Sequence, residues 1–179
     1  MRYETIITQP LIETERFSLR PVLRSDIGLL QMYTADKRVA EATTSIPHPL
    51  PPGTTEAFVA RAMSAERLED IWIMDGNQKG QAEVFGVIGL KPMDRKQSEV
   101  GYWVAPAFWN SGLASEAVQA LIAANPQQCK TLFAQVFQDN PASARVLTKA
   151  GFEYLGDAET HCVARAANVA TWTYLKKFA

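Results

Sequence analysis

Short segments in which apolar residues alternate with polar ones, or run together, are typical of β-strands. The predicted strands cover residues 17–22, 71–74, 84–90, 99–104, 131–137, 152–163 and 168–175. Polar turns at residues 75–77 and 94–97 separate the second, third and fourth of these strands. We therefore expect these three strands to pair as an antiparallel meander, and the last two to form a hairpin.

Apolar positions at helical spacing predict four helices. The clearest has Leu113, Ala117 and Leu121 on one face and ends before Pro126. Pro141 opens another, because proline suits the first helical position, and that helix ends at Gly151. The other two helices are expected over residues 25–42 and from residue 54 onward.

The order of elements predicts the fold class and the number of domains. A strand–helix–strand unit over residues 100–137 favours one parallel strand pair within an otherwise antiparallel sheet. We therefore expect an α/β fold with a mixed sheet of about seven strands and about four helices. The proline-rich residues 46–53 are too short for a domain linker, so the whole chain, residues 1–179, is expected to form one domain.

Composition excludes several classes of protein. The chain has 179 residues, 47% hydrophobic residues and a net charge of −1, which gives no global field to attract nucleic acid or anionic lipid. No apolar run approaches the ~20 residues of a membrane helix, and the charged N-terminus is unlike a secretion signal, so a cytoplasmic location is expected. The two cysteines and the two histidines show no metal-ligand spacing, and no metal is predicted.

Residues 99–117, EVGYWVAPAFWNSGLASEA, contain the most informative turn. The strand stops at Pro106, and the Asn110-Ser111-Gly112 turn leads directly into a helix. The backbone N–H groups of Ser111, Gly112, Leu113 and Ala114 would lack helical partners, and Gly112 permits close approach of a phosphate. A simple strand-to-helix turn has the same pattern, and neither common nucleotide fingerprint is present.

Asn140-Pro141-Ala142-Ser143 opens the next helix after the next strand. Asn140 is a strong N-cap, and capping alone would explain it. Two neighbouring polar helix starts at the carboxyl ends of strands nevertheless indicate a ligand crevice.

These residues resemble a known family. Residues 99–104 with 109–117 resemble the acetyl-CoA motif of the GNAT N-acetyltransferase superfamily. The N-x-x-S-x-x-V-L-x-x-A-G-F pattern of residues 140–152 and the opening residues 11–20 are similar to its RimJ/RimL-like branch, whose members resemble ribosomal-protein N-acetyltransferases. The resemblance covers about residues 11–175 and implies a GNAT-like fold with acetyl-CoA as the acyl donor.

The resemblance also implies roles for individual residues. Asn140 would bind the pantetheine arm, and Ser143 would lie near its thiol. In this branch a Gly-Lys pair commonly stands where the chain has Asn110-Ser111, so a positive charge near the phosphates is missing and weaker coenzyme binding is expected. Trp103 and Val104 would lie beside the pantetheine, and the pyrophosphate would be held by Asn110, Ser111, Gly112, Leu113, Ala114 and Ser115.

Direct attack of an amine on a thioester requires a base, an oxyanion donor and a donor to the departing thiolate. Glu99 is the predicted base because the strand period places it on the face of Trp103; a solvent-facing strand carboxylate is the alternative. Ser143 is the predicted donor to the thiolate, although it also fits a capping role. The resemblance places the oxyanion donor at the Val104 N–H. His48 and Tyr33 are predicted to contact the acceptor substrate.

We expect the acceptor to be an N-terminal α-amine of a protein or peptide. An α-amine with a pKa of ~7.8 is roughly 15% neutral at pH 7, against ~0.04% for a lysine amine, so it needs little help from a base. A small amine (polyamine, amino acid or antibiotic) and a non-catalytic acyl-CoA-binding module remain alternatives. No nucleic acid or membrane partner is expected, and either a monomer or a homodimer is compatible with the sequence.

Overall fold

The computed structural model describes residues 9–178. Residues 1–8, on which part of the expectation about location rests, lie outside this range. The strands are β1 (Ile12–Glu13), β2 (Ser18–Pro21), β3 (Asp70–Asp75), β4 (Gly86–Met93), β5 (Gln97–Val104), β6 (Thr131–Phe137), β7 (Glu153–Cys162) and β8 (Ala167–Lys177). The α-helices are α1 (Ile27–Thr34), α2 (Lys37–Glu41), α3 (Thr54–Met63), α4 (Leu113–Ala124) and α5 (Pro141–Lys149).

The strands form one mixed sheet in the order β1-β2-β3-β4-β5-β6-β8-β7. The β3–β4–β5 meander and the β7–β8 hairpin are antiparallel, and β5 and β6 form the parallel pair, which confirms the predicted fold class. The eighth strand, β1, was not predicted because two residues are too few to show a period of two.

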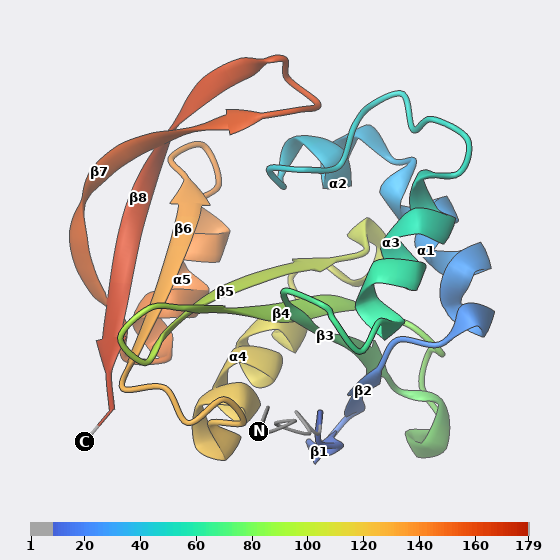
Figure 1. The fold of residues 1–179 in the computed structure, drawn as a ribbon, viewed down its shortest axis with the longest axis horizontal. Coiled ribbons are helices and arrows are strands. Elements are labelled where there is room, and N and C mark those ends of the chain that lie inside the picture. Colours follow the sequence, from blue (N-terminus) through green and yellow to red (C-terminus); the bar gives the residue numbers. More distant parts are fainter. Residues whose placement is uncertain (1–8, 179) are drawn as a thin grey trace, which may run out of the picture.

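Helices cover both faces of the sheet (Figure 1). Alternation along β3 divides the core: Trp72 and Met74 pack in the cluster that includes α4 and α5, while Ile71 and Ile73 pack in the cluster with α1 and α3. None of the helices within residues 9–178 is long and apolar enough to cross a bilayer.

The predicted helix over residues 25–42 is wrong in one respect, because it is broken into α1 and α2. Asp36 lies in the break with an extended backbone, and its side chain accepts a hydrogen bond from Arg38 N at 2.9 Å. Asp36 therefore caps the start of α2, and its preference for an N-cap outweighs the continuing apolar pattern.

β5 and β6 pair at only three positions, from Gln97↔Thr131 to Glu99↔Phe133. Each strand then continues, to Val104 in β5 and Phe137 in β6, while pairing only with its other neighbour. Figure 1 shows β6 leaving β5 at a steep angle. Residues 100–104 of β5 and 134–137 of β6 therefore each have one edge without a strand partner, and we call these the open edges.

The tip of the β7–β8 hairpin is joined to the last residue of α2 and to the segment that follows it. Val163 N donates to Thr44 O at 3.0 Å, and Arg165 Nε and Nη2 donate to Glu41 O at 3.0 and 2.7 Å. Arg165 Nη1 also donates to Asp139 Oδ2 at 2.5 Å. These contacts, which we call the hairpin strap, connect the β6–β8 part of the sheet with the α1–α2 region (Figure 1).

Candidate active site

Val104 directs its backbone polar groups toward the open edge of β5. The next residue, Ala105, donates its N–H to Phe85 O at 2.9 Å, on the side of β4. Because successive residues of a strand direct these groups to opposite edges, Val104 N–H faces away from β4. Val104 O accepts a hydrogen bond from Trp109 Nε1 at 2.7 Å, which fixes the next turn against the end of the strand.

The turn after β5 has two residues in the left-handed backbone region. Asn110 has φ 59° and Gly112 has φ 78°, and asparagine tolerates this region better than most side chains. Ser111 Oγ donates to Phe108 O, which holds the turn together. A Cβ on Gly112 would approach only Arg16 Nη2, at 3.5 Å, so the convex side of the turn is uncrowded.

The start of α4 has free backbone donors. The first helical bond runs from Glu116 N to Gly112 O at 3.1 Å, and no side chain caps the helix. The N–H groups of Leu113, Ala114 and Ser115 are thus left without helical acceptors, as an anion site requires. The Leu113 side chain is buried, and the Ser115 hydroxyl is buried and hydrogen-bonded within α4, so both residues present only their backbone.

The start of α5 meets β5 through a pair of hydroxyl groups. Asn140 caps α5 by accepting a hydrogen bond from Ser143 N at 3.4 Å. Tyr102 Oη lies 2.8 Å from Ser143 Oγ and 3.1 Å from Ser143 O. Burial raises the pKa of Tyr102 to about 12 against the opposing effect of Ser143, so the hydroxyl stays protonated at neutral pH. The sequence analysis missed Tyr102, although strand alternation places it opposite Trp103.

Glu99 stands where the pairing of β5 with β6 ends. Its side chain is half-buried, and no residue between 9 and 178 forms a hydrogen bond or ion pair with its carboxylate. Glu69 is a second carboxyl that the sequence analysis missed. Burial raises the pKa of Glu69, Lys91 acts against this, and the negative charge of Glu99 adds to it. Lys91 is also the register partner of Glu99 on β4, so two carboxyls and one lysine lie close together at the start of the open edge.

The predicted acceptor residue Tyr33 lies on the face covered by α1 and α3, and His48 lies in the loop that precedes α3. Tyr33 packs edge-on against Trp103, with ring centroids 6.4 Å apart, and its hydroxyl donates to Val84 O at 3.2 Å. Burial raises the Tyr33 pKa. Tyr33 can therefore offer an apolar wall, while its hydroxyl is already engaged. Among the residues from 9 to 178, the buried His48 Nδ1 has no hydrogen-bond partner, and this ring makes no hydrogen bond to the other predicted residues.

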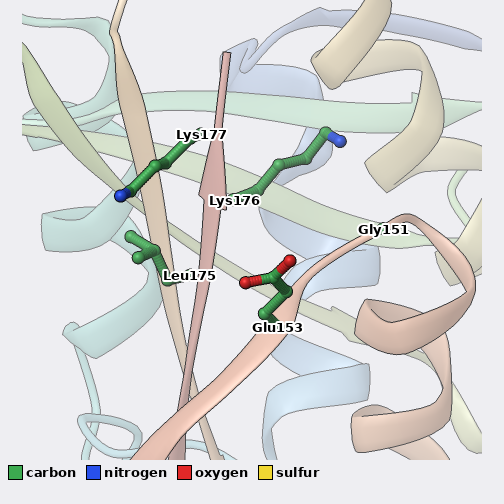
Figure 2. A pocket seen from close by; sticks show the side chains of 5 residues that line it. All are labelled: Gly151, Glu153, Leu175, Lys176 and Lys177. Atoms are coloured by element: carbon green, nitrogen blue, oxygen red, sulfur yellow. The ribbon is translucent and has the colours of Figure 1, made fainter. Parts of the chain in front are cut away.

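Two of the pockets in the described part of the chain bear on the predicted site. One, of about 250 Å³, adjoins the turn and is lined in part by Arg16, Trp109 and Ser111. The other, of about 130 Å³, lies at the beginning of β7 and contains none of the predicted site residues (Figure 2). Lys176 and Lys177 leave β8 there in different directions. Within residues 9–178, no group of His, Cys, Asp or Glu could hold a metal ion.

The site thus combines a mixed sheet that parts between two parallel strands with an uncapped helix start beside the open edge. The sequence model of the family described as "Acetyltransferase (GNAT) domain" matches residues 16–153. The chain belongs to the GNAT acetyltransferase family. It is 28% identical over 156 residues to "Uncharacterized N-acetyltransferase YoaA" of Bacillus subtilis (strain 168), a match that covers 82% of this chain and 85% of that protein.

Solved structures share the fold over nearly the whole chain. RimL, a ribosomal L7/L12 alpha-N-protein acetyltransferase in complex with coenzyme A, has a TM-score of 0.79 and 18% identity, covering 94% of this chain and 98% of that one. MccE, a microcin C7 self immunity acetyltransferase in complex with acetyl-CoA and AMP, has 0.78 and 16%, covering 92% and 93%. The ribosomal-protein-S5-alanine acetyltransferase from Vibrio fischeri has 0.75 and 19%, covering 94% and 97%.

Family membership defines the general activity. The protein is an acetyl-CoA-dependent N-acetyltransferase, which acts on amines. The residues of this chain fit the donor, since an open strand edge leads to a glycine-containing turn and to free N–H groups at a helix start.

Proposed function

We propose that the enzyme acetylates the α-amine at the N-terminus of a protein or peptide, with the coenzyme lying along the open edge of β5. The observation that carries this proposal is the continuity of that edge with the uncapped start of α4. An extended pantetheine arm can pair with the open edge as a strand would, and the N–H groups from Ser111 to Ser115 can receive the pyrophosphate. Trp103 and Asn140 would flank the arm from β5 and α5.

In this proposal, acetyl-CoA supplies a thioester whose carbonyl carbon the acceptor amine attacks. Glu99 accepts the amine proton through intervening water, because it stands five strand residues, about 16 Å, from Val104. Within residues 9–178 its carboxylate has no hydrogen bond or ion pair that would occupy it. Val104 N–H, which faces the open edge, donates a hydrogen bond to the developing oxyanion. The negative charge is thus stabilised by a backbone group that strand geometry already holds in place.

Ser143 assists the departing sulfur. Its hydroxyl lies 2.8 Å from Tyr102 Oη, and Tyr102 remains a proton donor at neutral pH. If Tyr102 donates to Ser143 Oγ, the Ser143 hydrogen is free to point into the site. Ser143 then donates a hydrogen bond to the thiolate, and Tyr102 acts as a positioning residue behind it.

Two observations bear on the acceptor. Within residues 9–178 the predicted base forms no ion pair, although Lys91 stands directly opposite it on β4. A carboxylate base of this kind suits an amine that is partly neutral at pH 7. RimL and the ribosomal-protein-S5-alanine acetyltransferase, whose names specify protein acceptors, are similar in fold. A small-molecule amine is the second candidate, because MccE, which is named for self immunity to microcin C7 and not for a ribosomal protein, aligns as well as RimL does.

The test is a thiol-release assay with acetyl-CoA and a panel of amines. The panel pairs peptides that have a free N-terminus with the same peptides N-terminally blocked but carrying an internal lysine, and adds polyamines and amino acid amides. We expect kcat/KM for the best free peptide to exceed that of its blocked partner at least tenfold. Faster turnover of a small amine would favour the second candidate, and coenzyme binding without release toward any amine would contradict both.

The pH profile gives an independent check. With an α-amine acceptor, kcat/KM should rise to a plateau near pH 8, whereas a lysine acceptor would keep it rising toward pH 10.

A further inference from the structure

The turn that would receive the coenzyme pyrophosphate carries no cation of its own. Residues 109–115 contain neither lysine nor arginine. A diphosphate carries two negative charges. At an exposed helix start, the free N–H groups stabilise each of these charges by only about 0.3–1 kcal/mol. Another part of the chain must supply a positive charge if the site is to bind the diphosphate strongly.

The fold brings Arg16 to this turn from the beginning of the chain. Arg16 Nη1 donates to Ser111 O at 2.8 Å, and Nη2 lies 3.5 Å from the position that a Cβ on Gly112 would occupy. The side chain is 39% exposed and lines the pocket of about 250 Å³ beside the turn. The guanidinium is therefore in contact with the turn and accessible to a ligand.

Arg16 is held in place by Glu116, in the first turn of α4. Arg16 Nε donates to Glu116 Oε1 at 2.8 Å, and Arg16 N donates to Glu116 Oε2 at 3.0 Å. Thr14 Oγ1 donates to the same Oε2 at 2.7 Å. Burial opposes ionisation of Glu116, but these hydrogen bonds keep its pKa below the usual value. Glu116 is thus a carboxylate, and without Arg16 its charge would repel an anion bound at the start of α4.

One donor group of Arg16 is left over. Within residues 9–178, Nη2 makes no hydrogen bond, although Nε and Nη1 are both engaged. A guanidinium held on two sides has lost most of its rotational freedom already, so a further hydrogen bond to a phosphate costs little additional entropy.

We propose that Arg16 binds the diphosphate of acetyl-CoA, supplying from outside the turn the positive charge that the turn lacks. Arg16 acts in two ways: it neutralises Glu116, and it offers Nη2 to a phosphate oxygen. This inference rests on the proposed function, which places the diphosphate at this turn.

The test compares Arg16→Gln, Arg16→Lys and Glu116→Gln with the control Arg61→Gln, which removes an equal charge from an exposed position on α3. Calorimetry gives Kd for CoA and for dephospho-CoA, and kcat/KM is measured with S-acetylpantetheine, which has no diphosphate. Arg16→Gln should weaken both coenzymes about tenfold, equivalent to about 1.4 kcal/mol, and leave S-acetylpantetheine unchanged. Arg16→Lys should retain most of the affinity, and Glu116→Gln should not weaken it.

Each contrary result has a distinct meaning. An equal loss with S-acetylpantetheine would show that Arg16→Gln merely distorts the enzyme, and a loss confined to CoA would assign Arg16 to the 3′-phosphate; either overturns the proposal. If Glu116→Gln lost as much affinity for CoA as Arg16→Gln, Arg16 would have only a structural role, and the proposal would be overturned. If the wild-type enzyme had the same kcat/KM with S-acetylpantetheine as with acetyl-CoA, the diphosphate would contribute nothing to binding. Both the proposed coenzyme site and the role of Arg16 would then be overturned.

Discussion

The hydroxyl pair of Tyr102 and Ser143 gives the sharpest test of the chemistry. Tyr102→Phe removes one hydroxyl without changing the ring. The Oη–Oγ distance of 2.8 Å is typical of a well-formed O–H···O hydrogen bond, which has a net value of about 1 kcal/mol. If that bond orients Ser143 in the transition state, kcat should fall about fivefold. Ser143→Ala, which removes the donor itself, should lower kcat on the order of 10- to 100-fold.

A double-mutant cycle separates this role from general damage. The proposal has Tyr102 act only through Ser143, so the double variant should be no slower than Ser143→Ala alone, with a coupling energy of about 1 kcal/mol. Rates are measured by thiol release at saturating acetyl-CoA. Tyr154→Phe is the matched control, since its hydroxyl binds Asp157 on exposed β7, away from the site.

The pH profile completes this test. With a pKa of about 12, Tyr102 stays protonated through pH 10, so the ratio of wild-type to Tyr102→Phe rates should be constant between pH 6 and 10. Additive losses in the double variant, or a Tyr102→Phe enzyme with full activity, would refute the reasoning.

Three further predictions follow from the site and its supports. Glu99→Gln should lower kcat at least tenfold and change the Kd of CoA less than twofold by calorimetry; an unchanged rate would remove Glu99 from the mechanism. Gly112→Ala should reduce the free energy of unfolding by about 1 kcal/mol through its φ of 78° and also weaken CoA, whereas Gly80→Ala, with φ 70° in open space, should cost similar stability and leave CoA binding intact. Arg165→Met should lower the Tm by about 5 °C, from about 2 kcal/mol of lost hydrogen bonds. The hydrogen bond from Arg165 holds the pKa of Asp139 below its usual value. The contribution of this ion pair to the free energy of unfolding is therefore present above about pH 4, and it is lost as the pH falls through the lowered folded-state pKa. A Tm difference between wild type and Arg165→Met that widened in acid would contradict this.

Local patterns predicted most of the fold. The apolar faces of the helices, the turns of the meander and the strand–helix–strand unit that gives the parallel pair are all properties of adjacent residues. The break between α1 and α2 also had a local signal, the N-cap residue Asp36, but the apolar period continued across it. Strand β1 is too short to show a period.

The candidate site was predicted where it is continuous in sequence. The turn from Trp103 to Ser115 and the start of α5 form such segments, and the fold places them beside the open edges. Contacts between distant segments could not be predicted in this way. Arg16 and Glu116 are 100 positions apart, and the pairing of Tyr102 with Ser143 depends on how α5 packs against β5. Only the folded chain brings these groups together.

The hairpin strap has a consequence for how the enzyme meets its donor. Two sheet halves joined at only three residue pairs would ordinarily swing about that junction, but Val163 and Arg165 tether the far ends to the segment after α2. The hairpin strap therefore restrains the two parts of the sheet from moving relative to each other. The open edges of β5 and β6 are held apart before any ligand binds. The entropy cost of ordering the open edges is incurred when the chain folds, so the binding site is already formed before the coenzyme binds. Amide hydrogen exchange near the hairpin strap should therefore change little when CoA binds.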